Sequence, residues 1–110
     1  MDDEINFYRD RVLSGKEHVE RVFENEHVLA FKHTNPSYPV HFVVIPKEEI
    51  DSILDLPLDC SLLVELVTAI KSVVNQIMET HGKCRVVTNV GKYQDSKHLH
   101  WHIISGKQYK

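Results

Sequence analysis

The alternation of apolar and polar positions predicts several short strands and one long helix. Runs rich in β-branched and aromatic residues, typical of strands, fall at 19–23, 27–31, 41–45, 85–90 and 98–104. Three polar residues separate the first two runs, which favours a hairpin. The third run is stopped by Pro46, because proline has no N–H to donate to a ladder.

A helical pattern lies between the third and fourth runs. Asp59 or Ser61 can cap its start, and Gly82 stands where a left-handed C-terminal residue belongs. We expect a helix from about residue 59 to 80. Apolar residues recur there at a spacing of three and four: Leu62, Leu63, Leu66, Val67, Ile70, Val73, Val74, Ile77 and Met78.

This order of elements predicts an α+β fold with a mostly antiparallel five-stranded sheet. The segment 5–12 is a short N-terminal element whose few apolar residues fit a helix or a strand equally well. At 110 residues, the chain has too little material for two independent cores. We therefore expect a single domain over residues 1–110.

The composition limits the classes of partner that we expect the chain to bind. The formal charge is −3 and no basic stripe runs along the chain, which argues against nucleic acid but allows one small phosphorylated ligand. No apolar stretch approaches the ~20 residues that cross a membrane, and none near the N-terminus has the length of a signal. Cys60 and Cys84 flank the helix, beyond disulfide reach. These features predict a cytoplasmic protein without membrane contact.

The segment from His98 to Ile104 carries the candidate chemistry. Alternation along a strand puts His98, His100 and His102 on one face, about 7 Å apart, with the intervening apolar residues on the other. Imidazole is the side chain whose protonation is adjustable near neutral pH. Three of them on a half-buried strand indicate a reactive centre.

Two other interpretations of these histidines stay open. A chance polar face on an ordinary strand explains one histidine well and two tolerably. A metal-dependent hydrolase is the stronger competitor, because His-x-His on a strand can place two nitrogens on one Zn²⁺. A straight strand does not easily bring three imidazoles to one ion, so we expect no metal.

The segment resembles the signature of the histidine triad (HIT) superfamily, in which histidines alternate with hydrophobic residues. Segments 28–31, 39–47, 87–91 and 103–108 are similar to its Hint branch, in the same order. The resemblance implies a hydrolase or transferase of nucleoside monophosphates that acts on purine nucleotides, typically adenosine 5′-phosphoramidates. It implies no cofactor, and a homodimer paired through the long helix and an adjacent strand.

The resemblance also implies the catalytic roles. His100 attacks the α-phosphorus and forms a nucleotidyl-histidine intermediate, which water then hydrolyses. His102 donates to the phosphate oxygens, and His98 and His41 support the network. For His41, a hydrogen-bonded core histidine is an equally good interpretation.

Substrate-binding residues are implied in the same way. Phe31 and Val43 correspond to the lining of the base and ribose pocket, although by sequence alone they are core residues. Asn89 resembles an asparagine that contacts the sugar-phosphate region; by sequence alone it is a turn residue. Gln94 and Asp95, in the loop before the triad, complete the expected substrate contacts.

Departures from the family pattern concentrate at two positions. His33 stands where the family has a ribose-binding carboxylate, and it cannot accept from both ribose hydroxyls. The loop before the triad is about two residues shorter, and Asp95 replaces a serine that assists the leaving group. Lys92 and Lys97 are interpreted as solvated loop residues.

One metal site of the family is also missing. Some members bind zinc through cysteines near the N-terminus, where this chain has Ile5 and Tyr8. We therefore predict no structural zinc.

Overall fold

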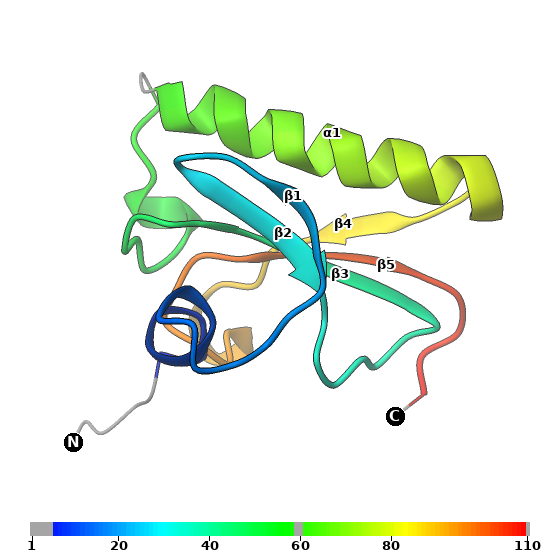
Figure 1. Cartoon of the computed structure of the whole chain (residues 1–110), viewed down its shortest axis with the longest axis horizontal. Coiled ribbons are helices and arrows are strands. Elements are labelled where there is room, and N and C mark those ends of the chain that lie inside the picture. Colours follow the sequence, from blue (N-terminus) through cyan, green and yellow to red (C-terminus); the bar gives the residue numbers. More distant parts are fainter. Residues whose placement is uncertain (1–5, 59–60, 110) are drawn as a thin grey trace.

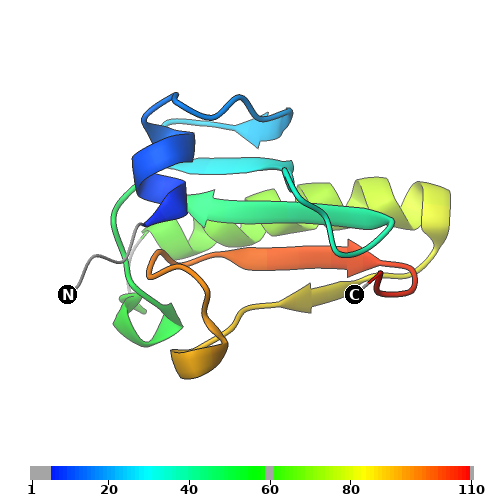
Figure 2. The same ribbon diagram turned by 90° about the horizontal axis from the view of Figure 1, so that it is seen from below.

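The computed structural model describes residues 6–58 and 61–109. In this part of the chain the strands form a five-stranded sheet in the order β1-β2-β3-β5-β4, in which all neighbours are antiparallel (Figure 2). The elements are the short helix η1 (Tyr8–Leu13), β1 (Arg21–Glu24), β2 (Val28–Lys32), β3 (Val40–Pro46), α1 (Ser61–His81), β4 (Arg85–Val87) and β5 (Trp101–Ser105). The expected α+β fold with a five-stranded antiparallel sheet and one long helix is confirmed.

The sheet separates two layers of core. Helix α1 covers one face, where Val28, Ala30 and Val44 meet the buried side of the helix (Figure 1). Alternate residues of the same strands point to the other face, where they form a second cluster around η1. The active-site candidates lie on this second face.

Helix α1 matches its predicted extent to within two residues at each end. It ends where expected: Gly82 adopts φ +75° and its N–H donates to the Met78 carbonyl at 3.1 Å, which is a left-handed helix end. Asp59, the other proposed cap, and Cys60 lie outside the described residues. The N-terminal element, left open by the sequence, is helical.

The expectation that no segment is long and apolar enough to cross a membrane is wrong for α1. Its length and composition satisfy that requirement. However, Leu66, Ala69, Val73 and Ile77 are buried within the structure, packed against the sheet. One face of α1 thus packs on the sheet, but only 22% of its apolar stretch is buried within the structure.

The last strand begins at Trp101 rather than at His98. The ladder between β3 and β5 ends at the pair Val44–Trp101, and residues 98–100 leave it although β3 continues to Pro46 beside β2. Other partners take over there: the Leu99 N–H donates to the Ile50 carbonyl at 2.7 Å, and the Thr88 hydroxyl donates to the His100 carbonyl at 2.8 Å. Strand β4 also ends early, at Val87 rather than residue 90.

Candidate active site

The three triad histidines still lie on the same face although only His102 belongs to a strand. Leu99 and Ile103 are buried in the core beneath α1. The His100 and His102 rings, on the opposite face, are 4.9 Å apart and nearly perpendicular. The alternation predicted from the sequence therefore extends beyond the start of β5.

Within the described residues, one ring nitrogen of His100 has a hydrogen-bond partner and the other has none. The residue is only 2% exposed, and its Nδ1 lies 2.6 Å from the carbonyl oxygen of His98. Because a carbonyl only accepts, Nδ1 carries the proton and Nε2 keeps its lone pair. Burial lowers the pKa of His100 below its usual range, so the ring is neutral at pH 7.

His98 supports this segment from within the protein. It is 0% exposed, and its Nε2 donates to the Pro46 carbonyl at 2.9 Å. The Asn6 side-chain amide approaches its Nδ1 at 3.4 Å. Burial lowers the pKa of His98. The side chain thus ties the triad segment to the end of β3 and to the N-terminal segment.

His41 and His102 form a directional chain that starts at a backbone amide. The Ser37 N–H donates to Nδ1 of His41 at 3.1 Å, which leaves the proton of His41 on Nε2. That Nε2 donates to Nδ1 of His102 at 2.9 Å. His102 therefore carries its own proton on Nε2, as a donor. Burial lowers the pKa of His41 to about 3 and that of His102 to about 4.

His33 extends this group by a third imidazole. Its ring centre lies 4.3 Å from that of His41 and 6.0 Å from that of His102. Its Nδ1 accepts the Asn35 N–H at 2.9 Å. One ring nitrogen from each of the three residues lies within 4.8 Å of the others, a spacing that can hold a metal ion. A metal on this face would thus use His102 with His33 and His41, rather than the three histidines of the triad.

Two adjoining cavities open over these side chains. One, of about 430 Å³, is lined by His100 and His102. The other, of about 420 Å³, is lined by His41, His102 and Asn89. His33 and Asp95 line both cavities. The structure therefore brings together His33, His41, Asn89, Asp95, His100 and His102.

Other predicted substrate-binding residues do not reach these cavities. Phe31 and Val43 are fully buried in the core cluster around η1. Gln94 is buried, and its side-chain amide donates to the Asp51 carbonyl at 2.5 Å, so it anchors the loop before the triad. The family resemblance placed these residues near the site, but burial and this hydrogen bond direct their side chains elsewhere.

Tyr8 is a site residue that the sequence did not reveal. Its ring centre is 4.7 Å from that of His100, and it lines the cavity over the triad. Burial and the charge of Asp95 raise its pKa, so it is a neutral phenol. No local pattern marks it, because its position depends on η1 packing across the sheet.

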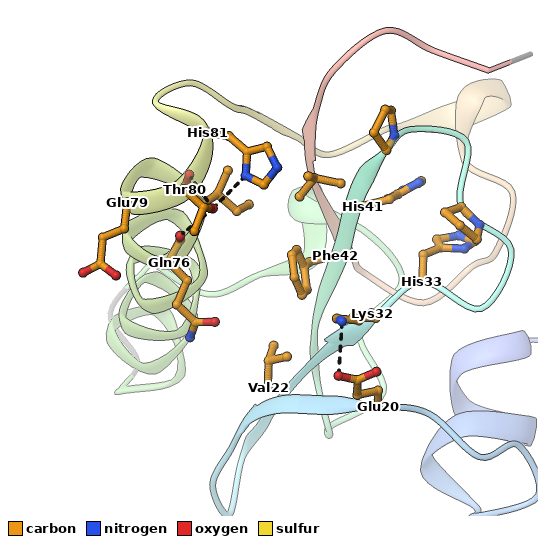
Figure 3. A pocket seen from close by; sticks show the side chains of 14 residues that line it. Glu20, Val22, Lys32, His33, His41, Phe42, Gln76, Glu79, Thr80 and His81 are labelled. Carbon is orange, nitrogen blue, oxygen red and sulfur yellow. Dashed lines mark hydrogen bonds and ion pairs between the residues drawn. The ribbon is translucent and has the colours of Figure 1, made fainter.

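A further cavity of about 680 Å³ lies on the opposite side of β3, near the end of α1 (Figure 3). Phe42 points into it, and His33 and His41 also contribute to its lining (Figure 3). An ion pair of 3.2 Å between Lys32 and Glu20 lies along its wall. The triad histidines are absent from its lining, so we place the candidate active site at the two smaller cavities.

Comparison with known proteins shows the family of the chain. The model of the HIT domain family matches residues 15–109. The chain belongs to the HIT domain family. An uncharacterized HIT-like protein of Helicobacter pylori is 31% identical over 102 residues, which cover 91% of this chain and 96% of that protein.

Solved structures of HIT proteins have the same fold. A "Hit Like Protein" superimposes with a TM-score of 0.80 at 31% identity, over 94% of this chain and 100% of that one. A HIT family hydrolase from Clostridium thermocellum gives a TM-score of 0.77 at 28% identity, over 88% and 87% of the two chains. The fold and family are thereby established, together with a likeness to hydrolases of this family.

Proposed function

We propose that this HIT protein cleaves nucleoside 5′-phosphoramidates or related nucleotidyl substrates, with adenosine as the typical nucleoside, through a covalent intermediate on His100. One observation carries the proposal. His100 has an unprotonated Nε2 and His102 has a protonated Nε2. The centres of the two rings are 4.9 Å apart, and both residues line one cavity. A nucleophile and a hydrogen-bond donor thus stand side by side, which suits attack on phosphorus.

In the first step, Nε2 of His100 forms a bond to the α-phosphorus and the bond to the amine leaving group breaks. The leaving nitrogen takes up a proton from solvent, balanced by the proton that water releases in the second step, and the His100 ring becomes cationic. The His98 carbonyl, 2.6 Å from Nδ1, stabilises that charge because a hydrogen bond from a charged donor is stronger. His102 donates to the phosphate oxygens as charge develops on them.

In the second step, water attacks the phosphorus and displaces His100. The water gives up a proton, the nucleoside monophosphate leaves, and the neutral imidazole is restored with its proton on Nδ1. Over the cycle one water is consumed, and one amine and one nucleoside monophosphate are released.

Asp95 bears on the choice of leaving group. Its exposed carboxylate lines both cavities, where it repels a phosphate and attracts a cation. We propose that it favours substrates whose leaving group is a positively charged amine. This accounts for a carboxylate beside a phosphoryl-transfer centre.

The experiment is to incubate the protein with adenosine 5′-phosphoramidate and measure release of AMP. We expect His100→Ala to lower kcat by roughly 10³-fold or more, because the covalent route is lost. Acid-quenched wild-type protein should carry a nucleotidyl adduct by mass spectrometry. His27→Ala, at an exposed histidine in another region, is the control. Wild-type turnover no faster than that of His100→Ala would exclude this function.

A non-catalytic module that binds nucleotides or a protein partner is the second candidate. It is favoured by His33 and Asp95, which depart from the family pattern and both line the cavities. Calorimetry with AMP tests it. Binding without turnover across a series of phosphoramidates would support the module over the enzyme.

We also propose a homodimer. The outward side of α1 exposes Val64, Val67 and Met78, and β4 forms a free edge of the sheet with Val86 exposed. Apolar side chains on a helix and an unpaired strand edge are surfaces that a second copy can cover. Light scattering at micromolar concentration should give twice the chain mass, and Val67→Glu should reduce it, whereas Lys71→Glu serves as the polar control.

A further inference from the structure

We infer that His33, His41 and His102 form a binding site for one divalent transition-metal cation of the zinc class, which inhibits the enzyme when it is occupied. Metal binding itself does not depend on the proposed function, but inhibition does. The inference begins from the three ring nitrogens that lie within 4.8 Å of one another. It departs from the expectation, drawn from the sequence, that the chain binds no metal.

The three imidazoles are chemically ready to act as ligands. In each ring, Nδ1 accepts a hydrogen bond. The donors are the Asn35 N–H for His33, the Ser37 N–H for His41, and Nε2 of His41 for His102. A ring with an accepting nitrogen is not an imidazolium cation. All three are therefore neutral, the form that binds metals.

For two of the three ligands the geometry fits with a small movement, whereas the His33 nitrogen lies within 4.8 Å of both and must move closer to them. Nε2 of His41 and Nδ1 of His102 are 2.9 Å apart, whereas two nitrogens on one tetrahedral Zn²⁺ are about 3.3 Å apart. The two rings therefore need to separate by a few tenths of an ångström. The hydrogen bond between them is replaced by two coordinate bonds.

The donor set indicates which cation binds. Three neutral imidazoles suit Zn²⁺, Cu²⁺ or Ni²⁺ and are poor ligands for Mg²⁺ or Ca²⁺, which prefer oxygen. Three protein ligands leave a fourth position open to water. Asp95 lines the same cavities and partly offsets the positive charge of the ion.

Coordination has a consequence for the loop that carries Asn35 and Ser37. When Nε2 of His41 binds the ion, the single N–H proton of the neutral ring moves from Nε2 to Nδ1. Nδ1 can then no longer accept a hydrogen bond from the Ser37 N–H. His33 loses the Asn35 N–H by the same argument, whichever of its nitrogens binds. These two modest hydrogen bonds are weaker than the coordination that replaces them, so the two amides change partners when the metal binds.

Metal binding also disables His102 as the hydrogen-bond donor to the phosphate oxygens. His102 is oriented by the hydrogen bond from His41, and its ring is 4.9 Å from that of His100. An ion on Nδ1 of His102 removes that orientation and occupies the cavity beside the nucleophile. Zinc and nucleotide should therefore compete.

The test begins with calorimetric titration of ZnCl₂ into the full chain. We expect one strong site per chain, weakened at least tenfold in His33→Phe, which keeps a ring against His41 but has no ligand atom. His33→Cys should retain the site through a thiolate. His81→Phe, at an exposed histidine on the end of α1, should bind like wild type, and MgCl₂ should give no comparable heat.

Amide NMR spectra then locate the site. Addition of Zn²⁺ should shift the backbone resonances of Asn35 and Ser37 in the wild type but not in His33→Phe. Equal zinc affinity of the wild type and His33→Phe, or binding that leaves both amides unmoved, would overturn the site. These readouts need no turnover, so they stand even if the proposed activity fails.

The inhibitory part is tested separately by measuring AMP release with increasing Zn²⁺. We expect KM for the nucleotide to rise at least tenfold when the site is saturated in the wild type, and to change less than twofold in His33→Phe. Unchanged or faster turnover of the zinc-saturated wild type would overturn inhibition while leaving the binding result intact.

Discussion

The two ends of the active-site region hold the same side chain in opposite hydrogen-bonding roles. At the triad end, His98 and His100 donate to the carbonyl oxygens of Pro46 and His98. At the other end, His33 and His41 accept from the backbone N–H groups of Asn35 and Ser37. All four rings are neutral, but the proton sits on Nδ1 in His100 and on Nε2 in the other three.

This difference shows how one residue type supplies two kinds of chemistry. A carbonyl partner fixes the proton on Nδ1 of His100 and leaves Nε2 as a nucleophile. An amide partner fixes the proton on Nε2 of His41, and the hydrogen bond to His102 transmits this preference to the phosphate donor. The backbone around each ring, rather than the ring itself, decides which role it takes.

Removal of the buried support at the triad end should have the largest effect. His98→Ala leaves a cavity and deprives the Pro46 carbonyl of its donor, which should lower the free energy of unfolding by about 3 kcal/mol. Urea unfolding measures it. The exposed His27→Ala control should stay within about 0.5 kcal/mol. A loss below about 1 kcal/mol for His98→Ala would show that the triad end does not depend on this contact.

Gly106→Ala should perturb the other end. Gly106 has φ +93°, and a Cβ there would lie 2.7 Å from Cγ of Pro39, which follows the loop of Asn35 and Ser37. Positive φ and this clash together should cost about 2 kcal/mol. Gly82→Ala, at φ +75° with nothing within 4 Å, should cost about 1 kcal/mol, and urea unfolding compares them. Equal losses would mean that contact with Pro39 has no effect.

Ser37→Pro should weaken the amide-directed chain without removing a histidine. Proline has no N–H, so Nδ1 of His41 loses its donor and the tautomer of His102 is no longer fixed. We expect kcat/KM to fall about tenfold, the equivalent of one hydrogen bond. Ser37→Ala keeps the amide and measures the side chain alone. If the two variants have equal kinetics, the tautomer of His102 does not affect catalysis.

The neutral state of the amide-directed pair predicts how stability depends on pH. The pKa of His41 is lowered to about 3 and that of His102 to about 4, against about 6.5 in the unfolded chain. Between these values the unfolded state binds more protons, so stability falls as pH decreases from about 6.5 toward 4. The slope should be on the order of 1 kcal/mol per pH unit for each histidine.

Urea unfolding at a series of pH values checks this slope. His41→Asn should show a shallower fall than the wild type, because one of the two groups has been removed. A wild-type stability that stays constant from pH 6.5 to 4.5 would contradict the neutral assignment of both rings.

The sequence was most informative where a pattern repeats along the chain. Runs of β-branched and aromatic residues located all five strands, and the three-and-four spacing located α1, because both patterns follow from burial against the core. The alternation at residues 98–104 also put His100 and His102 on the face opposite Leu99 and Ile103. It did not reveal that β5 begins at Trp101, because residues 98–100 take hydrogen-bond partners outside the β3 ladder, such as the Ile50 carbonyl.

By itself, then, the sequence determined the fold, the family and the side of the sheet on which His100 and His102 lie. Only the tertiary structure decided the proton positions, the place of Tyr8 against His100 and the gathering of His33 with His41 and His102. These features arise between residues far apart in the chain, from backbone groups that carry no side-chain signal. Tautomer and metal-ligand geometry depend on such contacts to within a few tenths of an ångström, which linear spacing cannot specify.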